Sequence, residues 1–152
     1  MPYLLLKWVH VLAAIVAVGA NVTYGIWIAR ASRNPDVLPF TLRGIKLIDD
    51  RVANPAYGML LITGLLMVFV SPFSLTTPWL LTALVLYVLV VLVGLLGYTP
   101  TLRRQIQLLD SEGFSSPNYQ ALARRGTILG VALAVLVIVI VFLMVVKPAL
   151  RA

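Results

Sequence analysis

Hydrophobic residues in this chain run in long stretches that contain no charged residue. Residues 8–29, 52–102 and 126–146 hold no Asp, Glu, Lys or Arg. A helix rises about 1.5 Å per residue, so roughly 20 apolar residues cross the roughly 30 Å hydrocarbon core of a bilayer. The first and third stretches therefore each predict one membrane-spanning helix.

The middle stretch is too long for a single span. It is interrupted by the run Ser-Pro-Phe-Ser-Leu-Thr-Thr-Pro at 71–78, whose prolines and hydroxyl residues suit a turn at the membrane interface. The pattern thus predicts an all-α, integral membrane four-helix bundle that forms a single transmembrane domain over 1–152. We expect its spans at about residues 3–29, 54–72, 79–98 and 127–147.

The polar segments between the spans also carry a helical pattern. From Pro39 to Val52, apolar residues recur every three or four positions with charged residues between them. This spacing predicts an amphipathic helix that lies on the membrane and leads into the second span through Asn54 and Pro55. A second amphipathic piece is expected within 101–125, interrupted by a turn near Gly113 and Pro117.

Composition agrees with this pattern. The 152 residues are 61% hydrophobic and 11% charged, whereas a soluble domain has roughly 45–50% apolar and about 25% charged residues. This excludes a soluble enzyme. Because the chain has no cysteine, disulfides, iron–sulfur clusters and thiolate metal sites are excluded as well.

The net charge of +7 reflects topology rather than a nucleic-acid partner. Five Lys or Arg lie between the first two spans and four between the last two, against three on the other side. By the positive-inside rule, both polar segments are cytoplasmic and both termini are outside. The sequence therefore predicts a multi-pass protein of the bacterial inner membrane, with its basic segments facing anionic lipids of the cytoplasmic leaflet.

The spans offer little conventional chemistry. Ion-coupled transport usually needs carboxylates or basic groups inside the bilayer. Because residues 8–29, 52–102 and 126–146 contain neither, the sequence argues against a proton- or sodium-coupled carrier. No hydrolase arrangement can be assembled either, so no catalytic residue and no acidic metal site is predicted.

His10 is the one histidine of the chain and lies inside the first span. At about 1.5 Å per residue it should sit on the order of 10 Å below the outer end of its helix. Two interpretations stay open: a hydrogen bond to a neighbouring helix, or an axial ligand of haem, with copper as a lesser option. A second ligand would be Met67 or Met144, which should lie at similar depth, or His10 of a second copy in a homodimer.

Small residues follow one face of the first and last spans at intervals of four. Such stripes let helix backbones approach closely, within one bundle or against a partner protein, and we favour contacts within the bundle. The residues predicted for helix packing are Ala13, Ala17, Asn21, Gly25, Gly126, Gly130 and Ala134.

Several short motifs resemble those of a bacterial membrane family. These motifs lie at residues 6–12, 54–58, 63–65, 78–80 and 145–148. In them the chain is similar to an uncharacterised four-span family, a domain of unknown function, related to copper-resistance protein D and to HemJ-type protoporphyrinogen oxidases. The resemblance implies a four-helix core and, from the HemJ-type members, a haem held by His10. Those oxidases carry a lysine early in the third span, in a Trp-Leu-x-x-Lys pattern. The corresponding run here is Trp79-Leu80-Leu81-Thr82-Ala83, without a lysine, which argues against the oxidase reaction.

The sequence therefore favours a membrane protein without catalytic machinery of its own. It would bind haem through His10 or serve as an accessory subunit of a membrane redox or energy-converting complex. The alternatives are a variant haem-dependent oxidase and, with less support, a small permease for an uncharged or metal substrate.

Overall fold

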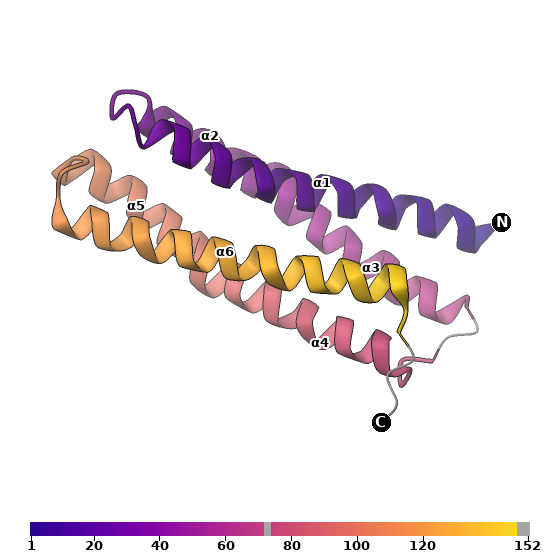
Figure 1. The fold of residues 1–152 in the computed structure, drawn as a ribbon. Coiled ribbons are helices and arrows are strands. Elements are labelled where there is room, and N and C mark those ends of the chain that lie inside the picture. The colour runs from indigo at the N-terminus through magenta and orange to yellow at the C-terminus, as the bar shows by residue number, and fades with distance from the viewer. Residues whose placement is uncertain (72–73, 149–152) are drawn as a thin grey trace.

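The computed structural model describes residues 1–71 and 74–148, which form helices and turns without a strand. Four long helical rods follow one another along the chain (Figure 1). The first is α1 (Pro2–Ala31), and the second joins α2 (Leu38–Ile48), the π-helical η1 (Asp49–Ala53) and α3 (Asn54–Phe69). The third joins α4 (Pro78–Leu92), the π-helical η2 (Val93–Tyr98) and α5 (Thr99–Glu112), and the fourth is α6 (Pro117–Val146).

Each rod is long and apolar enough to cross a membrane, which confirms the predicted all-α architecture with four spans. The turn expected near Gly113 is also confirmed, because α5 ends at Glu112 and α6 begins at Pro117. Gly113 has a φ of 81°, a left-handed conformation that suits glycine. Residue 72, at the end of the second predicted span, lies outside the described residues, as does Arg151.

The rods are longer than the predicted spans. They contain 30, 32, 35 and 30 residues, which gives about 45–53 Å at 1.5 Å per residue, compared with roughly 30 Å of hydrocarbon. Most of the extra length is at one end of the bundle, which contains α2, α5 and the adjoining turns of α1 and α6. We call this the polar end. The opposite end, with the N-terminus and the end of α6, is called the terminal end (Figure 1).

The segment 39–52 is helical and leads into the second span as predicted, since α2 continues through η1 into α3 without a break. The expectation that its apolar face lies on lipid differs from the structure, in which neighbouring helices cover that face. Its apolar face, which includes the buried Leu38, Leu42 and Ile45, packs against α1 and α5. The segment joins the bundle because neighbouring helices, rather than lipid, cover its apolar face. In the same way, α5 continues α4 through η2.

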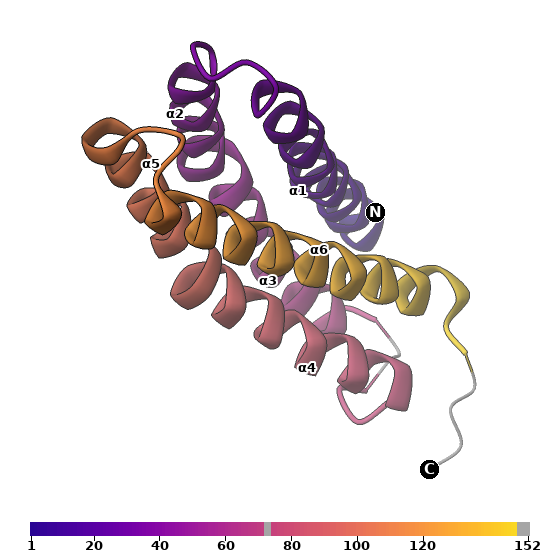
Figure 2. The ribbon, with the colours of Figure 1, turned by 60° about the vertical axis from the view of Figure 1, so that its left-hand side comes forward.

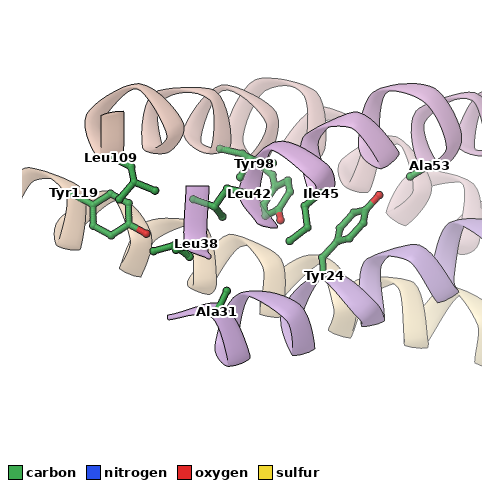
Figure 3. Close-up of a cluster of buried hydrophobic side chains, with 10 residues drawn as sticks. Tyr24, Ala31, Leu38, Leu42, Ile45, Ala53, Tyr98, Leu109 and Tyr119 are labelled. Atoms are coloured by element: carbon green, nitrogen blue, oxygen red, sulfur yellow. The ribbon is translucent and has the colours of Figure 1, made fainter. Parts of the chain in front are cut away.

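The helices pack as two main pairs, α1 with α3 and α4 with α6 (Figure 2). At the polar end, α2 and α5 contact each other and link the pairs. A buried hydrophobic cluster fills this region (Figure 3). It consists of Tyr24, Ala31, Leu38, Leu42, Ile45, Ala53, Tyr98, Leu102, Leu109 and Tyr119.

A short polar network begins α6. The Ser116 hydroxyl accepts hydrogen bonds from the backbone N–H groups of Asn118 and Tyr119, as an N-cap does. The carboxylate of Glu112 in turn accepts hydrogen bonds from the side chains of Ser116 and Asn118. These hydrogen bonds hold the pKa of the Glu112 carboxyl below its ordinary value. The network fixes the tight turn between α5 and α6.

Candidate functional site

A cavity of about 830 Å³ lies toward the terminal end, between α1, α3, α4 and α6. It is separate from the buried cluster of the polar end, and its walls are mostly aliphatic side chains of the four helices. His10 is one of the few polar groups that line it. Pockets of roughly 300–1,000 Å³ with apolar walls and a few polar groups are typical of small-molecule and cofactor sites.

The ring of His10 is held by a hydrogen bond to α3. Its Nδ1 lies 2.9 Å from Oγ1 of Thr63, a buried residue whose hydroxyl donates to the backbone carbonyl of Met59 at 2.7 Å. A hydroxyl has one proton to donate. Since that proton goes to Met59, Thr63 accepts from His10, so the hydrogen-bond network assigns the imidazole proton to Nδ1. The lone pair of a neutral His10 is then on Nε2.

The backbone of α3 approaches His10 closely at Gly64. A Cβ atom at this position would lie 3.2 Å from Cε1 of His10, tighter than ordinary van der Waals contact. A side chain at position 64 would therefore displace the ring. Thr63 and Gly64 together position the imidazole, the first by a hydrogen bond and the second by leaving space for it.

The two methionines predicted as partners of His10 line the same cavity. Met67 reaches it from α3 and Met144 from α6, and both are half-buried. The structure thus brings the three predicted ligand residues together on one cavity, although they come from three helices. Among the described residues, no group of three or more His, Cys, Asp or Glu side chains could hold a metal ion.

Two cationic side chains also line this cavity. Lys7 lies near the start of α1, and Lys147 immediately follows α6. The ammonium group of Lys147 lies 5.6 Å from the centre of the Trp79 ring, within the range of a cation–π contact. The cavity therefore combines an apolar interior with positive charge toward the terminal end of the bundle.

The residues predicted for helix packing have different environments. Ala13 and Ala17 are buried, and the half-buried Asn21 donates hydrogen bonds to the carbonyl of Ala17 and the hydroxyl of Tyr57 on α3. Gly25 and Ala134 are exposed. The first stripe thus follows the α1–α3 interface through Asn21, and Gly25 faces outward.

The glycines predicted for packing on α6 lie near the third rod. A Cβ at Gly126 would be 3.4 Å from the side-chain oxygen of Gln105, and one at Gly130 would be 3.7 Å from the ring of Tyr98. Small residues here allow polar and aromatic side chains of that rod to lie against α6.

Asp49, a buried carboxylate in η1, was not predicted from the sequence. It is 5% exposed, and its Oδ2 lies 3.5 Å from both the amide nitrogen of Asn54 and the hydroxyl of Thr99, directly after η2. This carboxylate of η1 therefore lies close to Thr99, the residue that follows η2, and π-helical segments are frequent at functional sites. A sequence signal existed, because Asp49 continues the buried repeat of Leu42 and Ile45 at intervals of three and four.

Comparison with known protein families matches residues 4–148 to a family described as predicted integral membrane protein (DUF2269). This description agrees with the four apolar helices of the structure. No curated protein and no solved structure matches the chain.

Proposed function

The chain belongs to DUF2269, a family of predicted integral membrane proteins, and we propose that it binds haem through His10 in the cavity at the terminal end. The observation that carries this proposal is the geometry of one side chain. His10 lines an apolar cavity of about 830 Å³, and its hydrogen bond to Thr63 leaves the lone pair on Nε2. A neutral imidazole with a free lone pair is the usual protein ligand of haem iron.

The contact with Thr63 supports the proposal further. Metal-binding histidines almost always donate their other ring N–H to an acceptor, which fixes the tautomer and the orientation of the ring. The Thr63 oxygen is such an acceptor, and its own proton is engaged by Met59. His10 is therefore held as a ligand would be, in addition to being satisfied as a polar group between helices.

Other residues of the cavity match the chemistry of a porphyrin. Met67 or Met144 would hold the iron together with His10 through a thioether, and a His/Met pair raises the reduction potential of haem iron. Lys7 and Lys147 supply positive charge for the carboxylates of the porphyrin. When bound, haem would supply one-electron redox chemistry.

We also propose which membrane contains the protein and how the chain is oriented in it. The distribution of Lys and Arg supports the bacterial inner membrane, with both connecting segments in the cytoplasm and both termini outside. We propose a redox or accessory role beside other membrane proteins rather than an independent enzyme. A relationship to the HemJ-type oxidases, in which the first-span histidine corresponds to His10, is part of this proposal.

The test is haem titration of the full chain purified in mild detergent, followed by the Soret band. We expect saturation at one haem per chain, loss of the band in His10→Ala, and roughly 10–100-fold weaker binding in Thr63→Val, which removes the partner of Nδ1. Val9→Ala is the matched control, because Val9 is a half-buried neighbour of His10 on α1 that does not line the cavity. It should bind haem as the unmodified chain does.

Two further measurements sharpen this test. Met67→Leu and Met144→Leu identify the second ligand, because loss of an axial thioether changes the spectrum of the reduced protein. Saturation at one haem per two chains would instead indicate two His10 ligands in a homodimer. Equal haem binding by His10→Ala and the unmodified chain, or no binding by either, would overturn the proposal.

A further inference from the structure

A second cavity, of about 530 Å³, lies at the polar end between α5 and α6. It is at the opposite end of the bundle from His10 and shares no residue with the haem cavity. Its walls combine two guanidinium groups with amide, hydroxyl and leucine side chains from both helices. The residues that matter here are Arg104, Gln107 and Ser111 of α5 and Asn118, Leu122 and Arg125 of α6.

The two arginines bring positive charge to one groove from two helices. The ion pairs among residues 1–71 and 74–148 are Arg43 with Asp110 and Lys46 with Asp50. Neither Arg104 nor Arg125 therefore has a carboxylate partner in the part of the chain that the structure describes. The nearby carboxylate of Glu112 accepts hydrogen bonds from Ser116 and Asn118. Both guanidinium groups are thus available to an anion.

The distance of the two arginines from the ends of the apolar spans indicates which class of anion they can reach. Arg104 follows Tyr98, the end of the third predicted span, by six residues, and Arg125 precedes the fourth span at 127 by two. At 1.5 Å per residue these positions lie about 9 Å and about 3 Å beyond the apolar spans. The headgroup layer adds roughly 5–8 Å to each side of the hydrocarbon core. Side chains as long as arginine therefore reach lipid phosphates from both positions.

We propose that this groove is a binding site for an anionic phospholipid, whose phosphate is held between Arg104 and Arg125. Arginine binds phosphate oxygens through two parallel N–H donors. Basic pockets between membrane helices are known to hold anionic headgroups. The side-chain amides of Gln107 and Asn118 provide donors for a polar headgroup beyond the phosphate. The hydroxyl of Ser111 donates its proton to the carbonyl of Gln107, so its oxygen is an acceptor there.

The chain contains its own control for general electrostatic attraction. Arg103 and Arg124 are the immediate neighbours of the two groove arginines, and all four are exposed. They have the same charge and nearly the same level in the bundle, but they do not line the groove. A diffuse attraction between basic surface and anionic leaflet would depend equally on either pair, whereas a defined site depends on Arg104 and Arg125.

The experiment measures lipid retained by the full chain. The protein is equilibrated in detergent with a mixture of phosphatidylcholine and phosphatidylglycerol, and the bound lipids are counted by native mass spectrometry. We expect one phosphatidylglycerol to be retained in preference to phosphatidylcholine. The double variant R104Q/R125Q should reduce this occupancy about tenfold, as expected for loss of charge-assisted hydrogen bonds, while R103Q/R124Q changes it less than about twofold.

A single-residue variant and a phosphate competition complete the experiment. Arg104→Lys keeps the charge and removes the two-donor geometry, so it should give an intermediate loss even if the double variant does not fold. Equal losses from the two double variants, or equal retention of phosphatidylcholine and phosphatidylglycerol, would overturn the proposal. Displacement of phosphatidylglycerol by millimolar inorganic phosphate would show that the groove binds a free anion instead of a lipid, which also overturns it.

Discussion

The imidazole of His10 lies in an apolar span, and residues of a neighbouring helix fix the orientation of its ring. In a bilayer core, an unsatisfied ring nitrogen would cost several kcal/mol, because no water is present to pair with it. Thr63 satisfies Nδ1 from the neighbouring helix, and Gly64 leaves space for the ring. The orientation of His10 is therefore a property of the α1–α3 contact and not of α1 alone.

This contact predicts different effects for alanine at two glycines of α3. A methyl group at Gly58 would have no atom within 4 Å beyond its chain neighbours and its own helix backbone, whereas a methyl group at Gly64 would lie 3.2 Å from His10. Gly58→Ala should stabilise the helix by about 0.5–1 kcal/mol. Gly64→Ala should show a smaller gain or a loss, and it should weaken haem binding. Denaturant titration in detergent and haem titration measure the two effects, and identical behaviour of both variants would contradict the assigned His10 position.

At the scale of the elements, the neighbours of α2 determine whether lipid or protein covers its apolar face. Leu38 and Leu42 are fully buried, and Ile45 is nearly so. Because α1 and α5 pack against α2, its apolar face is removed from water without lipid. The continuous helix from α2 through η1 to α3 follows from this packing.

The docking of α2 on α5 should depend on packing rather than on its ion pair. Arg43 binds both carboxylate oxygens of Asp110 at 2.7 and 2.9 Å, but the two side chains are 58% and 45% exposed. Exposed pairs contribute roughly 0–1 kcal/mol, whereas truncation of a buried leucine costs about 2–5 kcal/mol.

We therefore expect Leu42→Ala to lower the free energy of unfolding by about 2–5 kcal/mol and Arg43→Ala by at most about 1 kcal/mol. Denaturant titration of the two adjacent variants in the same detergent makes the comparison. A larger loss from Arg43→Ala than from Leu42→Ala would show that charge, rather than burial, holds α2 against α5.

At the scale of the whole molecule, the helices are held together by different forces at the two ends of the bundle. At the polar end the bundle extends beyond the spans, and a hydrophobic cluster forms there because water drives apolar side chains together. Inside a bilayer this driving force between helices is absent, since lipid tails are as apolar as leucine. The terminal half accordingly has many exposed apolar side chains and a cavity between its helices.

Four spans require both termini to lie on one face of the membrane, and the basic connecting segments predict that this face is the outer one. Reporters fused to the N- and C-termini should both report the outside. A reporter inserted in the turn at 113–116, between α5 and α6, should report the cytoplasm. Termini on opposite faces would contradict the four-span topology, and termini on the cytoplasmic face would contradict the orientation.

The sequence by itself determined the number of membrane spans and their helical type. Long stretches without charge can persist only in hydrocarbon, so 8–29, 52–102 and 126–146 were sufficient to predict four spans. The expectation that His10, Met67 and Met144 lie at similar depth rests on helical rise alone. These properties are local, because each depends on a residue's position within its own segment.

Only the tertiary structure decided what these segments contact. It placed His10, Met67 and Met144 on one cavity and gave His10 its partner Thr63. It also packed α2 against α1 and α5 and buried Asp49 beside Thr99. Each of these features depends on which face of a helix meets another helix. Each span is hydrophobic on all its faces, and lipid can cover any of them. The hydrophobic pattern along the chain therefore gives little information about which face packs against another helix.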